Sequence, residues 1–327
     1  MTNLEPPNPF VIDHETAMTM VVRASSLRAL PLVASGFAKE GFLGSVPHDY
    51  KLRRLKKVMG STRYQQAQNI QAERDKKMAE GRFNEAPTEN ALYLLLNTAD
   101  EAHCFYSIQL ETSQAANAVA YEAVIKDLPP ESVVADLGCF TGSFARLIAS
   151  EHPSLVVHGL DHLPNLIAIA NSTPHPPNVT FEVWNYTATT SCPQFYAQAL
   201  TSVLSLPLSD LLAPGDFGGL PKDSREAPVY AKALELARTA ASNWAKIATP
   251  DASLCVVARA GTPPLILAIA EGCQQAGWQL RKQSTRVVRT SEEAVPCFVF
   301  DRTDTPQPCT ALSNEEATAI WFAGLLA

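Results

Sequence analysis

The chain has 327 residues, of which 46% are hydrophobic and 18% charged, and its formal net charge is −7. This composition is that of an ordinary globular protein with room for one large α/β domain and an additional element. The acidic balance excludes the globally basic surface of a typical nucleic-acid binder, and no apolar run reaches the roughly 18 residues that a membrane span needs.

The seven cysteines are scattered along the chain and form no C-x-x-C pair. Their spacing argues against a disulfide framework and against a metal site, and it favours a reducing compartment. The first residues lack the basic and apolar regions of a signal peptide. We therefore expect a cytoplasmic protein with no metal and no membrane partner.

The chain before residue 116 has the character of a helical region. Residues 1–14 look like a tail, and the apolar spacing of residues 15–39 predicts a helix. Residues 51–82 hold ten lysine or arginine residues against three acidic ones. Such a segment is either the solvated face of a helix, which we favour, or a surface for phosphates and acidic substrates. Residues 89–128 predict one or two amphipathic helices.

A strand, a tight turn and a helix follow one another between residues 133 and 149. The β-branched run that starts at Val133 indicates a buried strand, and Asp136 lies near its end. Gly138 and Gly142 permit a positive φ and a close approach of a ligand to the backbone. The free amides at the start of the following helix favour a carboxylate or a phosphate. This stretch predicts a ligand cradle, although a buried turn without a ligand would show the same pattern.

Strands and helices alternate through the rest of the chain. Residues 155–161 predict a second strand that ends at Asp161, and residues 178–185 predict a third. The remaining expected elements are a fourth strand (199–206), a loop (207–228), a helix (230–248), a strand (252–258), a helix (264–276), two closely spaced strands (280–288 and 295–300) and a C-terminal helix with a capping box at Ser313–Glu316. This order predicts an α/β domain with a mostly parallel sheet and one antiparallel edge.

The segment Asp136-Leu-Gly138-Cys-Phe140-Thr-Gly142 resembles the D-x-G-x-G-x-G first motif of class I S-adenosylmethionine (SAM) dependent methyltransferases. It departs from the motif at Phe140, which stands where the family has its middle glycine. The order of the strands is also similar to that family. The resemblance implies a seven-stranded, mostly parallel sheet with helices on both faces, formed by residues 116–327, and an added N-terminal helical region over residues 1–115.

The resemblance also implies S-adenosyl-L-methionine as the cofactor and a set of residues that bind it. The loop would pass beneath the methionine part, Asp161 would accept hydrogen bonds from the ribose hydroxyls, and the residues after the third strand would face the adenine. The implied cofactor-binding residues are Asp136, Gly138, Cys139, Phe140, Gly142, Asp161, His162, Asn185 and Tyr186. Two alternatives stay open: Asp136 caps the amides of its own loop, and Asp161 caps a helix.

The acceptor side has weaker sequence signals. SAM is already activated, so a base is needed only where the acceptor must lose a proton. His103, Tyr106 and His162 are the candidate catalytic residues, and the alternative is that they are simply packed side chains. The apolar helical faces of residues 1–115 must be buried against something. We expect them to form a lid over the acceptor pocket, and a dimer surface is the alternative.

Together these features predict a SAM-dependent methyltransferase that acts on a small-molecule acceptor. Two alternatives stay open: a methyltransferase that acts on RNA through residues 51–82, and a non-catalytic scaffold or regulatory subunit with the same fold. Nucleic acid is therefore a less favoured partner than a small molecule. Homodimer formation is left open, and the sequence does not identify the acceptor.

Overall fold

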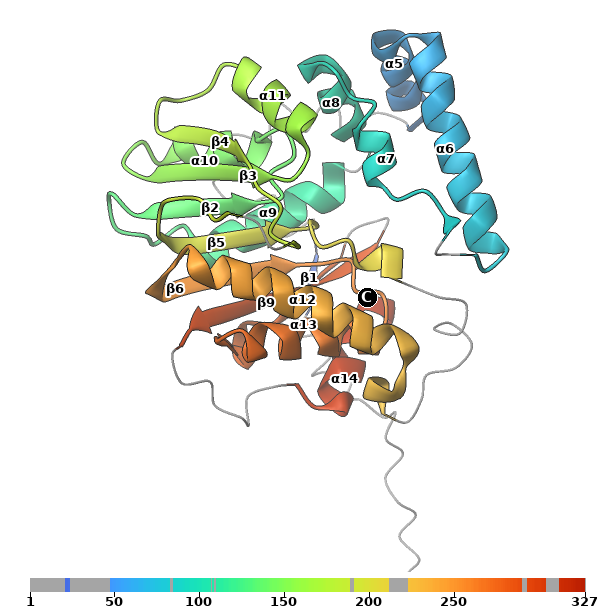
Figure 1. Ribbon diagram of the computed structural model, residues 1–327. Coiled ribbons are helices and arrows are strands. Elements are labelled where there is room, and N and C mark those ends of the chain that lie inside the picture. Colours follow the sequence, from blue (N-terminus) through green and yellow to red (C-terminus); the bar gives the residue numbers. More distant parts are fainter. Residues whose placement is uncertain are drawn as a thin grey trace, which may run out of the picture.

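The computed structural model shows one mixed β-sheet flanked by helices, with further helices at one end of the molecule (Figure 1). It describes residues 21–23, 48–82, 85–106, 108, 110–188, 191–211, 223–289, 293–303 and 312–326. None of the helices in these ranges is long and apolar enough to cross a membrane.

Within these ranges the sheet has nine strands, and eight of them lie in the order β1-β8-β9-β6-β5-β2-β3-β4, with β7 paired to β9. Strand β9 is antiparallel to its neighbours, and every other pairing is parallel. The strands are β1 Val21–Arg23, β2 Val133–Leu137, β3 Val156–Asp161, β4 Val179–Val183, β5 Ala197–Val203, β6 Ala248–Val257, β7 Trp278–Leu280, β8 Arg286–Arg289 and β9 Ala294–Arg302. The predicted mostly parallel α/β sheet with one antiparallel strand near its edge is confirmed.

Two predicted elements differ from the structure, which is why the sheet has nine strands rather than seven. The expected strand 280–288 is divided into β7 and β8 by a 3-10 turn at Lys282–Ser284, so that two short strands pair with β9. The helix expected over 15–39 is wrong at Val21–Arg23, which forms β1 beside β8. The β-branched Val21 and Val22 pair there with Val287 and Val288. The remainder of 15–39 lies outside the described residues.

Helices cover both faces of the sheet and create two apolar cores. One face carries α9, α10 and α11, and its core includes Phe144 and Ile148. The other carries α12, α13 and α14, and its core includes Trp244 and Trp278. Because both faces are covered, the central strand β2 is buried almost throughout, as expected for a parallel sheet. The helices are α9 Leu110–Val124, α10 Ser143–Glu151, α11 Pro164–Ser172, α12 Pro228–Lys246, α13 Pro263–Gln275 and α14 Asn314–Leu326.

The described ranges before residue 107 hold four helices, which lie at the end of the molecule where α11 is found (Figure 1). They are α5 His48–Met59, α6 Ser61–Ala79, α7 Asn90–Tyr93 and α8 Ala99–Tyr106. Leu55, Leu96 and Ala102 form a third apolar cluster with Leu166 of α11, and Phe140 packs against it. This contact ties the N-terminal helices to the loop that follows β2. The predicted boundary at residue 115 falls inside α9, which packs against the sheet.

Two polar contacts hold these helices in place. The guanidinium of Arg63 on α6 donates to both carboxylate oxygens of Glu101 on α8, at 2.8 and 2.6 Å, and Glu101 is almost fully buried. The side-chain amide of Asn165 on α11 donates to the backbone oxygens of Tyr93 and Leu96, both at 3.0 Å. Residues 93–101 are therefore fixed against the helix that follows the second strand of the parallel sheet.

Candidate functional site

The loop between β2 and α10 has a left-handed backbone at three positions. Gly138, Phe140 and Gly142 have φ values of 74°, 54° and 77°. A Cβ at Gly138 would lie 2.2 Å from Cβ of Ser205, and a Cβ at Gly142 would lie 2.2 Å from Cε1 of Phe181. The glycines are therefore required by backbone conformation and by close packing against the protein's own side chains.

Phe140, the departure from the motif, points toward the N-terminal helices. Its ring contacts Tyr93 edge-on, with 5.5 Å between centroids and 73° between planes. It is stacked with Tyr106 at 6.3 Å and 26°. A non-glycine residue in a left-handed conformation is uncommon, and here this aromatic packing accompanies it. The side chain at this position thus forms a wall shared by the loop and the helices that cover it.

Asp136 lies at the carboxyl end of β2 and is only 3% exposed. Its Oδ1 accepts a hydrogen bond of 3.3 Å from the hydroxyl of Thr201, whereas no hydrogen bond of normal geometry reaches its Oδ2 from the described residues. Burial raises the pKa of this carboxyl to about 7. The backbone N–H of Ala145 has only a minor lowering effect on the pKa of the carboxyl. A buried carboxylate oxygen without a partner is costly, and it marks a place where a donor from a ligand would be stabilising.

Asp161 lies at the end of the neighbouring strand β3 and is 5% exposed. Its Oδ2 accepts the backbone N–H of Phe140 and its Oδ1 that of Leu163, each at 3.0 Å. Nδ1 of His162 lies 3.5 Å from Oδ1, and burial raises the pKa of the carboxyl. Asp161 thus binds one backbone N–H of the cradle loop and that of Leu163, the N-cap residue of α11, and it makes no cap bond to the first turn of that helix. It fixes the cradle loop to the start of α11.

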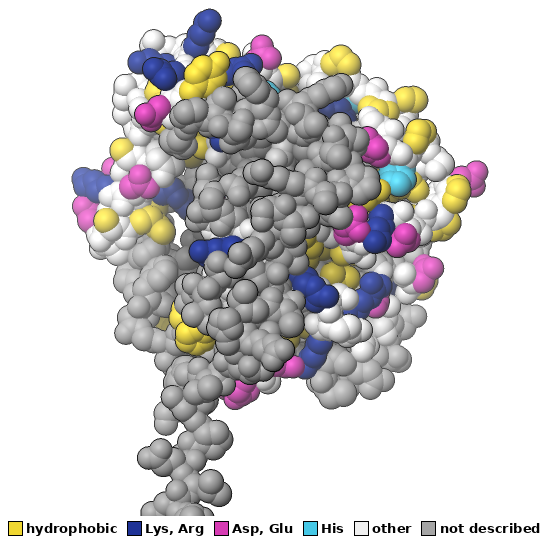
Figure 2. Space-filling model, turned by 180° about the vertical axis from the view of Figure 1, so that it is seen from behind, with side chains coloured by type: hydrophobic (Ala, Val, Ile, Leu, Met, Phe, Trp, Pro, Cys, Tyr) yellow, Lys and Arg dark blue, Asp and Glu magenta, His cyan; other side chains and the backbone are white. Residues whose placement is uncertain are grey.

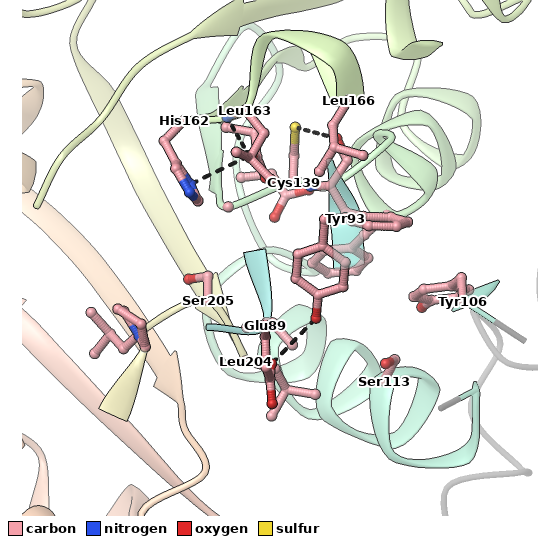
Figure 3. Close-up of a pocket in the computed structure, with 18 of the residues that line it drawn as sticks. Glu89, Tyr93, Tyr106, Ser113, Cys139, His162, Leu163, Leu166, Leu204 and Ser205 are labelled. Carbon is pink, nitrogen blue, oxygen red and sulfur yellow. Dashed lines mark hydrogen bonds and ion pairs between the residues drawn. The ribbon is translucent and has the colours of Figure 1, made fainter. Parts of the chain in front are cut away.

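These residues surround a cavity at the carboxyl ends of the strands, where open α/β sheets bind ligands (Figure 3). Most of the predicted site residues line it: Tyr106, Asp136, Gly138, Cys139, Phe140, Asp161, His162 and Tyr186. Three do not, namely His103, Gly142 and Asn185. The loop after β2 and the region before residue 110 thus meet in one cavity.

The residues predicted to face the adenine have other contacts in this structure. Oδ1 of Asn185 accepts hydrogen bonds from the backbone N–H and the hydroxyl of Thr187, at 3.1 and 2.8 Å. Tyr186 is buried, and its hydroxyl donates to the backbone oxygen of Ser205 at 3.1 Å. Its ring packs against Trp244 of α12. Of these two predicted residues, Tyr186 lines the cavity and Asn185 does not.

A polar group at the cavity wall was missed from the sequence. Oε2 of Glu89 accepts a hydrogen bond of 3.3 Å from the hydroxyl of Tyr93 and lies 4.0 Å from Nη1 of Arg259. Nε of Arg259 also lies 3.1 Å from Oε2 of Glu293. Arg259 follows β6, so the rule that ligands bind at strand ends could have found it. Glu89 and Tyr93, which also belong to this group, carry no sequence signal.

The basic segment 51–82 forms α5, α6 and the turn after them, and much of its charge is compensated. Arg63 pairs with Glu101, and Lys77 and Arg82 both pair with Glu85. Arg53, Lys56 and Lys57 on α5 have no ion pair within the described ranges; Lys56 lies over the ring of Tyr64 instead. Seen from behind, Lys and Arg side chains gather at this end of the molecule (Figure 2).

Comparison with protein-family models and with curated proteins finds no match. Among solved structures, the chain is similar to an O-methyltransferase family protein from Burkholderia thailandensis, with 15% identity and a TM-score of 0.48 over 73% of this chain and 70% of that one. It is also similar to magnesium protoporphyrin IX methyltransferase from Synechocystis PCC 6803 with bound SAM (13%, 0.40, 61% and 84%). A third is a TehB-like SAM-dependent methyltransferase from Corynebacterium glutamicum (16%, 0.39, 57% and 88%).

The sheet itself assigns the fold. From β8 to β4 the strand order and the single antiparallel strand β9 are those expected for the family whose first motif the loop after β2 resembles. The motif lies on the central strand, and the second acid lies on its neighbour. By the order and direction of its strands, the chain has the fold of class I SAM-dependent methyltransferases.

Proposed function

We propose that this chain binds S-adenosylmethionine and transfers its methyl group to a small-molecule acceptor. The observation that carries the proposal is the unpartnered Oδ2 of Asp136, a buried carboxylate oxygen in a residue that lines the cavity. SAM bears two positively charged groups, an ammonium and a sulfonium. Their charge, and the N–H donors of the ammonium group, suit a cavity wall that holds a buried carboxylate. Asp161, at the next strand end, adds a second buried carboxylate.

The cradle residues have distinct roles in this proposal. Asp136 would accept a hydrogen bond from the ammonium group, and the amides at the start of α10 would face the carboxylate. Asp161 and His162 would hold the ribose, and Tyr186 would face the adenine. When bound, the cofactor supplies an activated methyl group, so this chain need only hold, orient and desolvate the acceptor.

The acceptor would enter from the side covered by residues 89–106, which we propose as the lid. Three of the side chains that this segment contributes to the cavity, Tyr93, Phe105 and Tyr106, are aromatic, which suits a small organic acceptor rather than an extended polymer. Tyr106 and His162 line the cavity and remain candidate bases. The side chain of His103 is not part of the cavity wall, so its proposed role has no support from the geometry.

A methyltransferase acting on RNA is the second candidate, because Arg53, Lys56 and Lys57 of α5 lack ion-pair partners in the described ranges. Binding to mixed tRNA should weaken steeply with salt if several phosphates are neutralised. Salt-independent or absent tRNA binding would leave the small-molecule acceptor. The third alternative, a non-catalytic scaffold, predicts cofactor binding without any methylated product.

The primary test is mass spectrometry of the purified protein for co-purified SAM or S-adenosylhomocysteine, followed by calorimetry with both. We expect binding at micromolar concentration or tighter, and an Asp136→Asn protein that binds at least tenfold more weakly because it loses a charged acceptor. Asp251→Asn, an exposed aspartate of β6, is the matched control and should bind normally. Absence of binding to the wild-type protein would refute the proposed function.

A further inference from the structure

Four aromatic rings line one side of the cavity: Tyr93, Phe105, Tyr106 and Phe140. Tyr93 stands nearly perpendicular to two of them, at 85° to Phe105 with 5.6 Å between centroids and at 73° to Phe140 with 5.5 Å. Tyr106 is close to parallel with Phe140. The rings therefore present surfaces in two directions. Aromatic faces arranged in this way attract organic cations through their quadrupoles.

The same side of the cavity carries an acidic side chain, Glu89. Glu89, whose side chain is 35% exposed, lies beside Tyr93, and its Oε1 accepts no hydrogen bond from the described part of the chain. The neighbouring cation, Arg259, is shared with a second carboxylate, Glu293. Asp136 and Asp161 line the cavity further in, and His162 is the other group there able to carry positive charge. Because the cation beside Glu89 is shared with Glu293, an ammonium group is a better partner for this wall than a carboxylate.

We propose that this aromatic and acidic wall is a binding subsite for a protonated organic amine, with the ammonium group against Glu89 and the apolar part of the molecule among the four rings. The inference rests on the proposed function, since the molecule would be the methyl acceptor, but the subsite consists of the chain's own residues. The ammonium group would first give one proton to the carboxylate of Glu89. The neutral nitrogen would then have the lone pair needed to attack the methyl group of SAM, and the rest of the cofactor would leave as the thioether S-adenosylhomocysteine. Two features, the four aromatic rings and the carboxylate of Glu89, both favour a positively charged ligand. The subsite thus specifies organic amines as the class of acceptor, whereas the loop after β2 concerns only the cofactor.

The experiment is calorimetry of the full chain with three probes that share a phenyl ring and a short chain: 2-phenylethylamine, 2-phenylethanol and 3-phenylpropanoate. We expect the amine to bind about tenfold more tightly than the alcohol, and the carboxylate to bind most weakly. This comparison uses the wild-type protein alone, so it does not depend on how a variant folds. Equal or tighter binding of the alcohol or the carboxylate, or no heat from the amine at millimolar concentration, would overturn the proposal.

Two variants then assign the selectivity. Glu89→Gln keeps the shape of the side chain and should abolish the preference for amine over alcohol, whereas Phe105→Leu should weaken both. Glu235→Gln on α12, an exposed site outside the cavity, should leave all three affinities unchanged. A preference that survives Glu89→Gln would contradict the assigned ion pair.

Titration of the same proteins with S-adenosylhomocysteine separates the two proposals. Amine binding without binding of S-adenosylhomocysteine would refute the proposed function and leave the subsite. Binding of S-adenosylhomocysteine without amine selectivity would refute the subsite alone.

Discussion

Replacing Asp161 by alanine should destabilise the fold as well as the cofactor site. The carboxylate accepts the backbone N–H of Phe140 and of Leu163, each at 3.0 Å, and it is nearly fully buried. A hydrogen bond to a charged group contributes about 1.5–3 kcal/mol, and relief of the buried charge offsets part of the loss. We therefore expect Asp161→Ala to lower the free energy of unfolding by about 2–4 kcal/mol.

The measurement is urea denaturation at pH 8, followed by tryptophan fluorescence and by far-UV circular dichroism. Asp161→Asn retains one acceptor oxygen, so it should lose about half as much as the alanine variant. Loss of the Phe140 anchor should also disturb the contact of that ring with Tyr93, which near-UV circular dichroism can detect. An unfolding midpoint equal to that of the wild type would refute this account and return Asp161 to a role in ligand binding alone.

Three further predictions concern stability. Because the pKa of Asp136 is raised to about 7 from 3.8, its contribution to the free energy of unfolding should fall between pH 4 and pH 7. Asp136→Asn carries no titrating carboxyl, so its free energy of unfolding should not fall in this way and at pH 8 should exceed that of the wild type by a difference on the order of 4 kcal/mol. A variant less stable than the wild type at pH 8 would contradict this prediction. Gly142→Ala should lose about 2–4 kcal/mol, since φ is 77° and the new Cβ would meet Phe181 at 2.2 Å. Gly60→Ala places its Cβ in open space, but Gly60 combines φ 77° with ψ 157°, a backbone region that glycine alone adopts readily, so in the same urea assay it should lose about 1–3 kcal/mol from backbone strain without any clash. Arg63→Met should lose about 2–3 kcal/mol by leaving its buried carboxylate partner unpaired, and the loss should shrink as that partner protonates toward pH 4; a loss independent of pH would contradict this.

The parallel part of the fold was predictable because its signals are local. The strands at 133–137 and 156–161 each begin with two valines and carry an acid at or near their carboxyl end. Strands that are buried on both faces consist mostly of apolar residues, which can be recognised in the sequence. The strand β1 could not be found in this way. Three residues have no period of their own, and their partner β8 lies near the other end of the chain.

In the candidate site, too, residues with a local sequence signal were predictable and residues placed by tertiary packing were not. The residues that follow strand ends in sequence, Asp136 and Asp161, were identified from their spacing, and both line the cavity. Glu89 and Tyr93 reach it through the packing of α7 against α11, which no short pattern encodes. His103 was predicted from its residue type and its place before the domain. Tyr106, one turn further along the same helix, lines the cavity and His103 does not, so the position along the helix axis decides which side chain reaches it.

The pairing of β1 with β8 also constrains the order in which the protein can be assembled. During synthesis the residues of β1 leave the ribosome long before those of β8, so this edge of the sheet can close only after nearly the whole chain has emerged. Until then the newly made β8 would present unpaired N–H and C=O groups. Closure joins segments at a very large sequence separation, which makes it a slow step. The first strand in the sequence is thus expected to be among the last to join the sheet.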